Sequence, residues 1–240
     1  MNKLDGITVS VGYGDFLAWS LPFNRNLFDR LVVVTTPEDK YTQDVCNHYY
    51  VECLQTDIFY KDGQKFNKGL GINYGLEKLD FPDWCIHFDA DVVFPPRAKE
   101  FLNKGTWNEQ YIYGVDRLMV PNDKAWFNFL NRPCSQSHGY SSWPIPFGMG
   151  YRVVWDNEGY LPIGYCQMFN RNSVYLKDPL YPTKFDTAAD SDIHFAKQWP
   201  RSNRELIKEF FVYHLDSELD ATGKNIGANW EGRKTPKFGF

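Results

Sequence analysis

The sequence has no long hydrophobic run and no sign of export. No stretch approaches the roughly 18 consecutive apolar residues that cross a membrane, and the N-terminus lacks the apolar core typical of a signal peptide. The five cysteines are an odd number and form no C-x-x-C pair, which indicates neither a disulfide framework nor a zinc ribbon. Because scattered thiols suit a reducing compartment, we expect a cytoplasmic protein without a membrane segment.

Positive charge is also scarce. Lys and Arg number 26 against 30 Asp and Glu, a net charge of −4, which argues against coating nucleic acid through bulk charge. Cations gather only at the end of the chain, where Lys224, Arg233, Lys234 and Lys237 accompany the single anion Glu231. This tail is either a solvated end or a local basic patch.

Three common catalytic motifs are missing. The chain has no G-x-x-x-x-G-K-[ST] phosphate loop and no G-x-S-x-G, and Gly12-Tyr13-Gly14 lacks the third glycine of a dinucleotide fingerprint. A nucleotidyltransferase, which also uses an α/β sheet, acids and a metal, normally has a basic residue in its first glycine loop. The segment VGYGDF offers only Asp15 there, which counts against nucleotidyl transfer, and we keep that activity as a rival interpretation.

Aromatic residues are abundant: 8 Trp, 15 Tyr and 19 Phe make up 18% of the 240 residues. Aromatic rings fill cores, and they also line sites that stack on sugars and bases. A chain of this length, with 43% apolar residues, buries a sizeable core without a disulfide or metal. We find no repeat or linker and expect one domain over residues 1–240.

The first hundred residues alternate between strand and helix patterns. Strands are expected at 7–13, 30–37, 50–56 and 83–96, and helices at 15–28, 37–49 and 65–79. Pro22 is expected to break the first helix. Four such units in order predict a mostly parallel, doubly wound α/β sheet.

The second half is less regular. We expect strands at 111–120 and 163–170, a helix at 190–199, and a last strand that ends the segment 205–216. Residues 131–165 are rich in Pro, Gly, Ser and aromatics and predict a long irregular segment.

The strongest local signal is Asp89-Ala90-Asp91, which follows a buried strand pattern and precedes an apolar run and Pro95. Ligands of open parallel sheets bind beyond the carboxyl ends of the strands. Two carboxylates one residue apart in a loop converge readily on a divalent cation, which would in turn grip a diphosphate. The alternative is a pair of solvated loop acids.

The order of these segments resembles nucleotide-sugar-dependent glycosyltransferases of the GT-A fold. The resemblance is carried by ITVSVGY, LVVVTTPED, FNKGLGINYGL and DWCIHFDADVVFPP, and it resumes at GYCQMFN, AADSDIHFAKQW and VYHLD. It implies a Rossmann-like GT-A fold in which residues 1–118 bind the nucleotide sugar and residues 119–240 form the acceptor side and the tail. The implied cofactor is Mn²⁺ or Mg²⁺, and the implied donor is a nucleotide-diphosphate sugar.

The closing pattern NW-x-GR-x-T-x-x-F resembles small phage-encoded glycosyltransferases, some of which decorate hydroxymethylated pyrimidines in phage DNA. This implies a hexosyl- or pentosyltransferase in the host cytoplasm, with a base such as 5-hydroxymethylcytosine in DNA as the acceptor. A glycan or small-molecule acceptor is the alternative, as is a non-catalytic nucleotide-sugar or glycan-binding module. Nothing in the sequence indicates the oligomeric state.

The resemblance assigns donor contacts to the ends of the first two strands and to the D-x-D loop. The residues are Val11, Gly12, Tyr13, Thr35, Thr36, Asp39, Asp89 and Ala90. Tyr13 would stack on the base and Asp39 would accept from its polar edge; the alternatives are a core tyrosine and a helix cap. Lys65, Asn67 and Lys68 open a helix, whose N-terminus favours a phosphate or the donor sugar, unless they form a solvated face.

The resemblance also implies a metal site and a base. His214 would join Asp89 and Asp91 as a metal ligand, a set that suits Mn²⁺ better than Mg²⁺, although a lone histidine is often structural. In inverting members an acid at a loop-to-helix junction deprotonates the acceptor. Asp192 matches that position best and Asp190 is the fallback; the usual pair is Glu-Asp, and either aspartate is also a favoured cap. Aromatic residues would wall the acceptor side: Trp143, Phe147, Tyr160 and Tyr165.

Overall fold

The computed structural model describes residues 3–79, 83–120, 123–130, 154–157, 159–185, 187–188 and 190–215. The strands are β1 (Leu4–Val9), β2 (Arg30–Thr35), β3 (Glu52–Gln55), β4 (Trp84–His87), β5 (Val92–Val93), β6 (Ile112–Met119), β7 (Trp155–Asp156), β8 (Gly159–Tyr160), β9 (Gln167–Asn170) and β10 (Arg204–His214). The helices are α1 (Gly14–Asn24), α2 (Lys40–Tyr49), α3 (Lys68–Leu79), α4 (Ala98–Lys104), α5 (Asp123–Leu130) and α6 (Ser191–Ala196), with short 3₁₀ turns η1 (Ile58–Gly63) and η3 (Arg201–Asn203).

Eight of these strands form one sheet in the order β3-β2-β1-β4-β9-β6-β10-β5. The first four strands along the chain pair in parallel, and so do β6 and β10. Because β9 runs antiparallel to both β4 and β6, those two strands point the same way. The carboxyl ends of β1, β2, β3, β4, β6 and β10 therefore meet at one edge of the sheet, where ligands of such folds bind.

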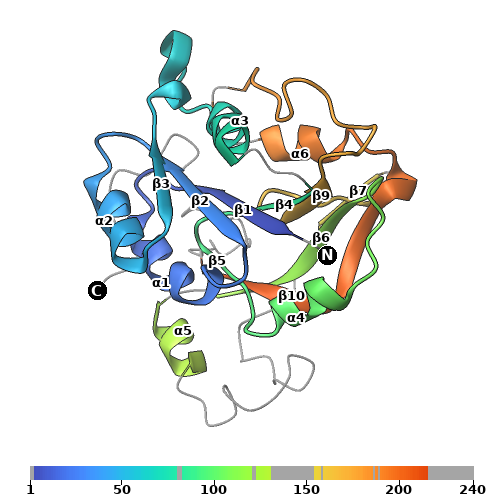
Figure 1. The fold of residues 1–240 in the computed structure, drawn as a ribbon, viewed down its shortest axis with the longest axis horizontal. Helices are drawn as coiled ribbons and strands as arrows, with labels where there is room; N and C mark the ends of the chain where they lie inside the picture. Colours follow the sequence, from blue (N-terminus) through green and yellow to red (C-terminus); the bar gives the residue numbers. More distant parts are fainter. Residues whose placement is uncertain are drawn as a thin grey trace.

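Helices cover both faces of the sheet (Figure 1). Helices α1, α2 and α4 pack against one face, around buried side chains such as Leu17, Val45 and Leu102. Helices α3 and α6 pack against the other, around Ile72 and Phe195. Strands covered on both faces are largely apolar, which is why β2 contains the continuous apolar run Leu31–Val34.

The expected doubly wound α/β architecture is confirmed, with shorter elements than the sequence indicated. The predicted strand 83–96 is wrong as a single element: β4 ends at His87, and Val92–Val93 form β5, which pairs with β10 instead. An apolar run does not distinguish one buried strand from two that pair at different places. The expected break at Pro22 is also wrong. Helix α1 continues through Pro22 to Asn24, because the proline removes only its own N–H bond to the preceding turn.

The second half of the chain completes the sheet of the first. The boundary expected at residue 118 falls inside β6, and β9 inserts between β4 and β6. Residues 131–153 of the expected irregular segment lie outside the described residues, and β7 and β8 form a small antiparallel pair just after them. Within the described ranges no helix is both long and apolar enough to span a bilayer.

Candidate metal and donor site

The loop 88–91 carries the D-x-D residues and connects β4 to β5. Strand β5 pairs antiparallel with the end of β10, with Val92 opposite His214. The Leu215 backbone N–H donates to the Asp91 backbone oxygen at 2.8 Å. This pairing sets Asp91 beside the end of β10, and so next to His214, although 122 intervening residues separate the two in sequence.

Two buried polar side chains of α1 hold the backbone of this loop and of the β5 segment that follows it. Ser20 Oγ donates to the Ala90 oxygen at 2.7 Å, and Asn24 Nδ2 donates to the Val92 oxygen at 2.7 Å. Asn24 Oδ1 also accepts from the Phe94 N–H at 2.8 Å. Sequence reasoning missed both side chains. Their one signal is the spacing of four, which places two polar residues on the helix face that buries apolar neighbours.

The three expected metal ligands come together. Asp89, Asp91 and His214 each offer a ligand atom, and these atoms lie within 4.8 Å of one another. Asp91 and His214 are buried, with Nε2 of His214 3.4 Å from Oδ1 of Asp91. Among the described residues, neither Asp91 Oδ1 nor His214 Nδ1 has a hydrogen-bond partner. Buried polar atoms are normally paired, so two unpaired ones in an O, O, N set fit a divalent cation.

Lys68, the first residue of α3, forms an ion pair with Oδ1 of Asp89. Burial disfavours the charge of Lys68, but attraction to Asp89, Asp192 and Asp91 outweighs it, and the pKa of Lys68 is raised. Burial likewise works against the charge of Asp89, yet Lys68 and His87 lower its pKa to about 2. The structure thus holds a cation and an ionised carboxylate at the N-terminus of α3, where anions are favoured.

The two expected candidates for the base differ in surroundings. Asp192, in the first turn of α6, is half-buried, and its Oδ2 accepts from the Gly164 N–H at 2.6 Å. Burial raises the pKa of Asp192 against the opposing effect of Lys68, which suits a group that takes up protons. Asp190 is exposed at the helix start with φ of 68°, and its side chain makes no capping hydrogen bond. The geometry therefore favours Asp192 over Asp190.

The ends of β1 and β2 are joined through the carboxylate of Asp39. Its Oδ2 accepts from the Gly12 N–H at 2.7 Å and from the hydroxyls of Thr42 at 2.7 Å and Thr35 at 3.2 Å. Its Oδ1 accepts from the Thr42 N–H and caps α2. Gly12 has φ of 67°, which favours glycine. The cap alternative for Asp39 is thus observed, and its contact with a base stays a prediction.

The remaining expected donor residues at this end surround that junction. Thr35 and Thr36 are buried, and the Thr36 oxygen accepts from Gln43 Nε2 at 3.0 Å. Val11 and Tyr13 are half-buried, and the Tyr13 ring stacks on Phe16 at 5.6 Å between centroids. The core alternative for Tyr13 is therefore observed in part, and base stacking remains untested.

We predict that Asp39→Ala weakens nucleotide binding as well as the fold. The loss of the α2 cap costs about 1 kcal/mol of unfolding free energy. The same change frees the Gly12 N–H and loosens the loop after β1, so nucleoside diphosphate affinity is expected to fall. Chemical denaturation and calorimetric titration measure the two effects. Asp44→Ala, in the middle of α2, is the control expected to alter neither, and unchanged affinity in Asp39→Ala would refute the donor assignment at this end.

Two other expected phosphate contacts have different environments. Asn67 is buried and fully used inside the protein: Oδ1 accepts from the Leu70 N–H at 3.0 Å, and Nδ2 donates to Gln64 Oε1 at 2.9 Å and the Thr183 oxygen at 2.7 Å. It begins α3 rather than offering a donor outward. Lys65 is exposed just before the helix. Lys68 is the member of this trio that the structure brings to the carboxylates.

The expected aromatic wall is wrong for the two members that are described. Tyr160 and Tyr165 are buried, and the Tyr165 hydroxyl donates to the Val115 oxygen at 2.6 Å, so these rings pack rather than line an open surface. Large buried rings and site-lining rings have the same sequence signal. Trp143 and Phe147 lie outside the described residues.

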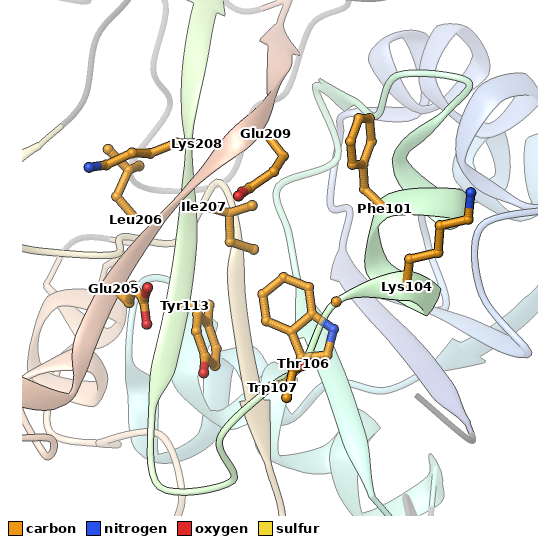
Figure 2. A pocket seen from close by; sticks show the side chains of 11 residues that line it. Phe101, Lys104, Thr106, Trp107, Tyr113, Glu205, Leu206, Ile207, Lys208 and Glu209 are labelled. Carbon is orange, nitrogen blue, oxygen red and sulfur yellow. The ribbon is translucent and has the colours of Figure 1, made fainter.

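A groove of about 440 Å³, which Asp89, Asp91 and His214 do not line, lies between α4 and the first half of β10 (Figure 2). Phe101, Trp107, Ile207 and Glu209 lie around it, and Tyr113 marks its position near the beginning of β6. The metal, base and donor candidates are all absent from its lining. Concavity alone therefore does not locate the candidate site in this fold.

No protein-family model matches this chain, and no curated protein matches it. Solved structures do. A mannosyltransferase from Pyrobaculum calidifontis, in complex with GDP-Man and Mn²⁺, has a TM-score of 0.55 at 12% identity and covers 90% of this chain. Glucosyl-3-phosphoglycerate synthase from Mycobacterium tuberculosis, in complex with Mn²⁺, UDP and glucosyl-3-phosphoglycerate, has a TM-score of 0.50 at 9% identity and covers 88%.

The match spans only part of those proteins: 57% of the mannosyltransferase and 71% of the synthase. At such low identity, the likeness concerns the arrangement of the chain and not its activity. The strand order, the helices on both faces and these two matches agree on one architecture. The chain has the GT-A, Rossmann-like fold.

Proposed function

We propose that this chain is a metal-dependent glycosyltransferase, which moves a sugar from a nucleotide-diphosphate sugar to an acceptor hydroxyl. The observation that carries the proposal is the convergence of Asp89, Asp91 and His214 at the carboxyl edge of the sheet. Lys68 and Asp192 lie in the same charged environment. The two solved structures of this fold bind Mn²⁺ together with GDP-Man or UDP, which supports the same ligands here.

Asp89, Asp91 and His214 would hold the divalent cation, and Mn²⁺ suits this mixture of carboxylates and imidazole. When bound, such a cation supplies positive charge for the diphosphate leaving group. Lys68 adds a second positive charge next to Asp89 and would stabilise the same developing negative charge. Helix α3 presents Lys68 from its first residue.

Asp192 would act as the base of an inverting reaction. Its carboxylate takes the proton of the acceptor hydroxyl as the hydroxyl oxygen forms a bond to the anomeric carbon. The bond between that carbon and the diphosphate oxygen breaks, and the electron pair leaves with the nucleoside diphosphate. The Gly164 N–H holds one carboxylate oxygen, Oδ2, so that the other oxygen would take the proton.

A panel of nucleotide sugars, measured by thermal shift with and without Mn²⁺, tests the donor assignment. A ligand that binds only the folded state, at a free concentration of about 100 times its Kd, stabilises that state by about 2.7 kcal/mol. We expect one nucleotide sugar to raise the melting temperature when Mn²⁺ is present and not in EDTA. No shift with any nucleotide sugar in Mn²⁺ would contradict the proposal.

Product analysis separates the proposal from its rivals. A glycosyltransferase with Mn²⁺ slowly hydrolyses its nucleotide sugar even without an acceptor, and releases a nucleoside diphosphate. A non-catalytic binding module would bind the nucleotide sugar and leave it intact. A nucleotidyltransferase would instead release pyrophosphate from a nucleoside triphosphate.

For the acceptor, we propose a hydroxymethylpyrimidine in DNA, supported by the four cations among the last twenty residues. Those residues lie outside the described part of the structure. Charge reversal at Lys234 and Lys237 is expected to weaken DNA binding and flatten its salt dependence, because fewer counterions are released. Donor binding should stay unchanged. An unaltered salt slope would return the tail to a solvated end and favour a glycan or small-molecule acceptor.

A further inference from the structure

The side chain of Gln167 is buried at the start of β9, and all of its hydrogen-bonding capacity is used. Its Nε2 donates to the backbone oxygens of Pro162 and Asp192, at 2.9 Å each. Its Oε1 accepts from the Tyr181 hydroxyl at 2.8 Å and lies 3.4 Å from Nδ1 of His87. Gln167, Tyr181 and His87 have no exposed surface. A buried amide with this set of partners is fixed in one orientation.

The two carbonyl groups that Gln167 binds belong to segments that also meet each other. Pro162 lies two residues before Gly164, whose N–H donates to Oδ2 of Asp192 at 2.6 Å. Gln167 therefore ties down the backbone on both sides of that hydrogen bond. The separation of the two segments is narrow: a Cβ added to Gly164 would lie 2.8 Å from Asp192 Oδ2.

We propose that Gln167 is a positioning residue for the Asp192 carboxylate, an inference that rests on the proposed function. One amide fixes both the turn that carries Asp192 and the segment that carries Gly164. It thereby sets where the carboxylate stands relative to the acceptor hydroxyl. A base must lie within hydrogen-bond reach of the proton it removes, and a misplacement of about 1 Å costs on the order of 10²-fold in rate.

The chemistry at this position requires an amide. A glutamate would present oxygen atoms to the backbone oxygens of Pro162 and Asp192, which repel them. A methionine has a similar length but offers no N–H group to these oxygens and no strong acceptor to Tyr181. Buried polar partners left without a bond carry a desolvation penalty, so the segments are expected to shift apart.

Gln167→Met is therefore compared with Gln198→Met. Gln198 is the matched control because it is also an amide that clamps backbone: Nε2 donates to the Leu180 oxygen at 2.7 Å, and Oε1 accepts from the Lys177 N–H at 3.0 Å. It lies just beyond the other end of α6. The measurements are kcat, the KM for the nucleotide sugar, and the amide proton of Gly164 in ¹⁵N-glycine-labelled protein. An N–H bonded to a carboxylate at this short distance exchanges slowly and resonates downfield.

We expect Gln167→Met to lower kcat about 10²-fold with an unchanged KM for the donor, because the loss concerns the transition state only. The Gly164 amide proton is expected to lose its downfield position. Gln198→Met should keep the wild-type kcat and the downfield position of the Gly164 amide proton. A Gly164 signal and kcat equal to wild type in Gln167→Met, or equal losses in both variants, would overturn the proposal.

If Gln167→Met does not fold, Tyr181→Phe replaces it, since it removes one bond to Gln167 and leaves Asp192 untouched. Its Gly164 signal is expected to move in the same direction by a smaller amount, and an unmoved signal overturns the proposal. Absence of sugar transfer by the wild-type protein would instead contradict the proposed function. The Gly164 comparison needs no turnover, so it decides the role of Gln167 in either case.

Discussion

Asp192→Asn is expected to lower turnover about 10²–10⁴-fold while folding, metal binding and donor affinity stay close to wild type. An acceptor hydroxyl is a poor nucleophile until its proton is being removed, and a positioned carboxylate contributes a factor of this size. Asparagine keeps the size of the side chain and an oxygen that accepts from Gly164, but it does not take up the proton. Steady-state kinetics with a saturating nucleotide sugar measure the loss.

Asp190→Asn is the matched control, since Asp190 begins the same helix with an exposed side chain. It should keep near-wild-type turnover. Asp192→Ala should in addition lose stability, because the Gly164 N–H loses its acceptor. If Asp192→Asn keeps more than about a tenth of wild-type turnover, Asp192 is not the base. Loss in Asp190→Asn instead would move the role to that residue, and loss in neither would favour a retaining reaction, in which the leaving diphosphate takes the proton.

Asp91→Ala is expected to abolish metal-dependent donor binding and turnover in a folded protein. The buried Oδ1 of Asp91 has no hydrogen-bond partner among the described residues and lies beside His214, so it is well placed as a ligand. The backbone bond between Leu215 and Asp91 does not depend on the side chain, so β5 stays paired with β10. Activity equal to wild type in this variant, or in EDTA, would reject the metal assignment.

Asp89→Ala is expected to have a milder effect than Asp91→Ala. The Asp89 carboxylate is shared with Lys68, whereas no cationic lysine or arginine pairs with Asp91 among the described residues. Removing Asp89 therefore removes one metal ligand and frees the ammonium group of Lys68, which remains available to the diphosphate. Manganese titration of the two variants, followed by electron paramagnetic resonance, compares their affinities. A larger loss in Asp89→Ala would assign the principal ligand to Asp89.

The architecture was predictable because its causes are local. The apolar runs of β1, β2 and β4, separated by segments with helix-start signals, indicate a parallel sheet with helices on both faces. The D-x-D residues were found for the same reason, since they follow a buried strand at the edge where ligands bind. His214 was assigned through resemblance alone. Its meeting with Asp91 depends on the pairing of β5 with β10, which no local pattern predicts.

The residues that position the site were not predictable. Ser20, Asn24 and Gln167 act through hydrogen bonds to backbone groups distant in sequence, and polar side chains in a helix or strand usually face solvent. The same limit applies to Asn67 and Asp39, whose roles as caps compete with ligand contact in any single sequence. Three-dimensional contact alone distinguishes a buried polar group that holds a site from one that is solvated.

Calorimetric titration of nucleoside diphosphates tests the central claim most directly, because it needs neither the sugar nor the acceptor. UDP, GDP, CDP and ADP are each titrated into the wild-type protein and into Asp91→Ala, in Mn²⁺ and in EDTA. We expect at least one of them to bind the wild-type protein in Mn²⁺, with binding lost both in EDTA and in Asp91→Ala. Equal binding in EDTA, or equal binding by the two proteins in Mn²⁺, would contradict a metal-dependent nucleotide site at Asp89, Asp91 and His214.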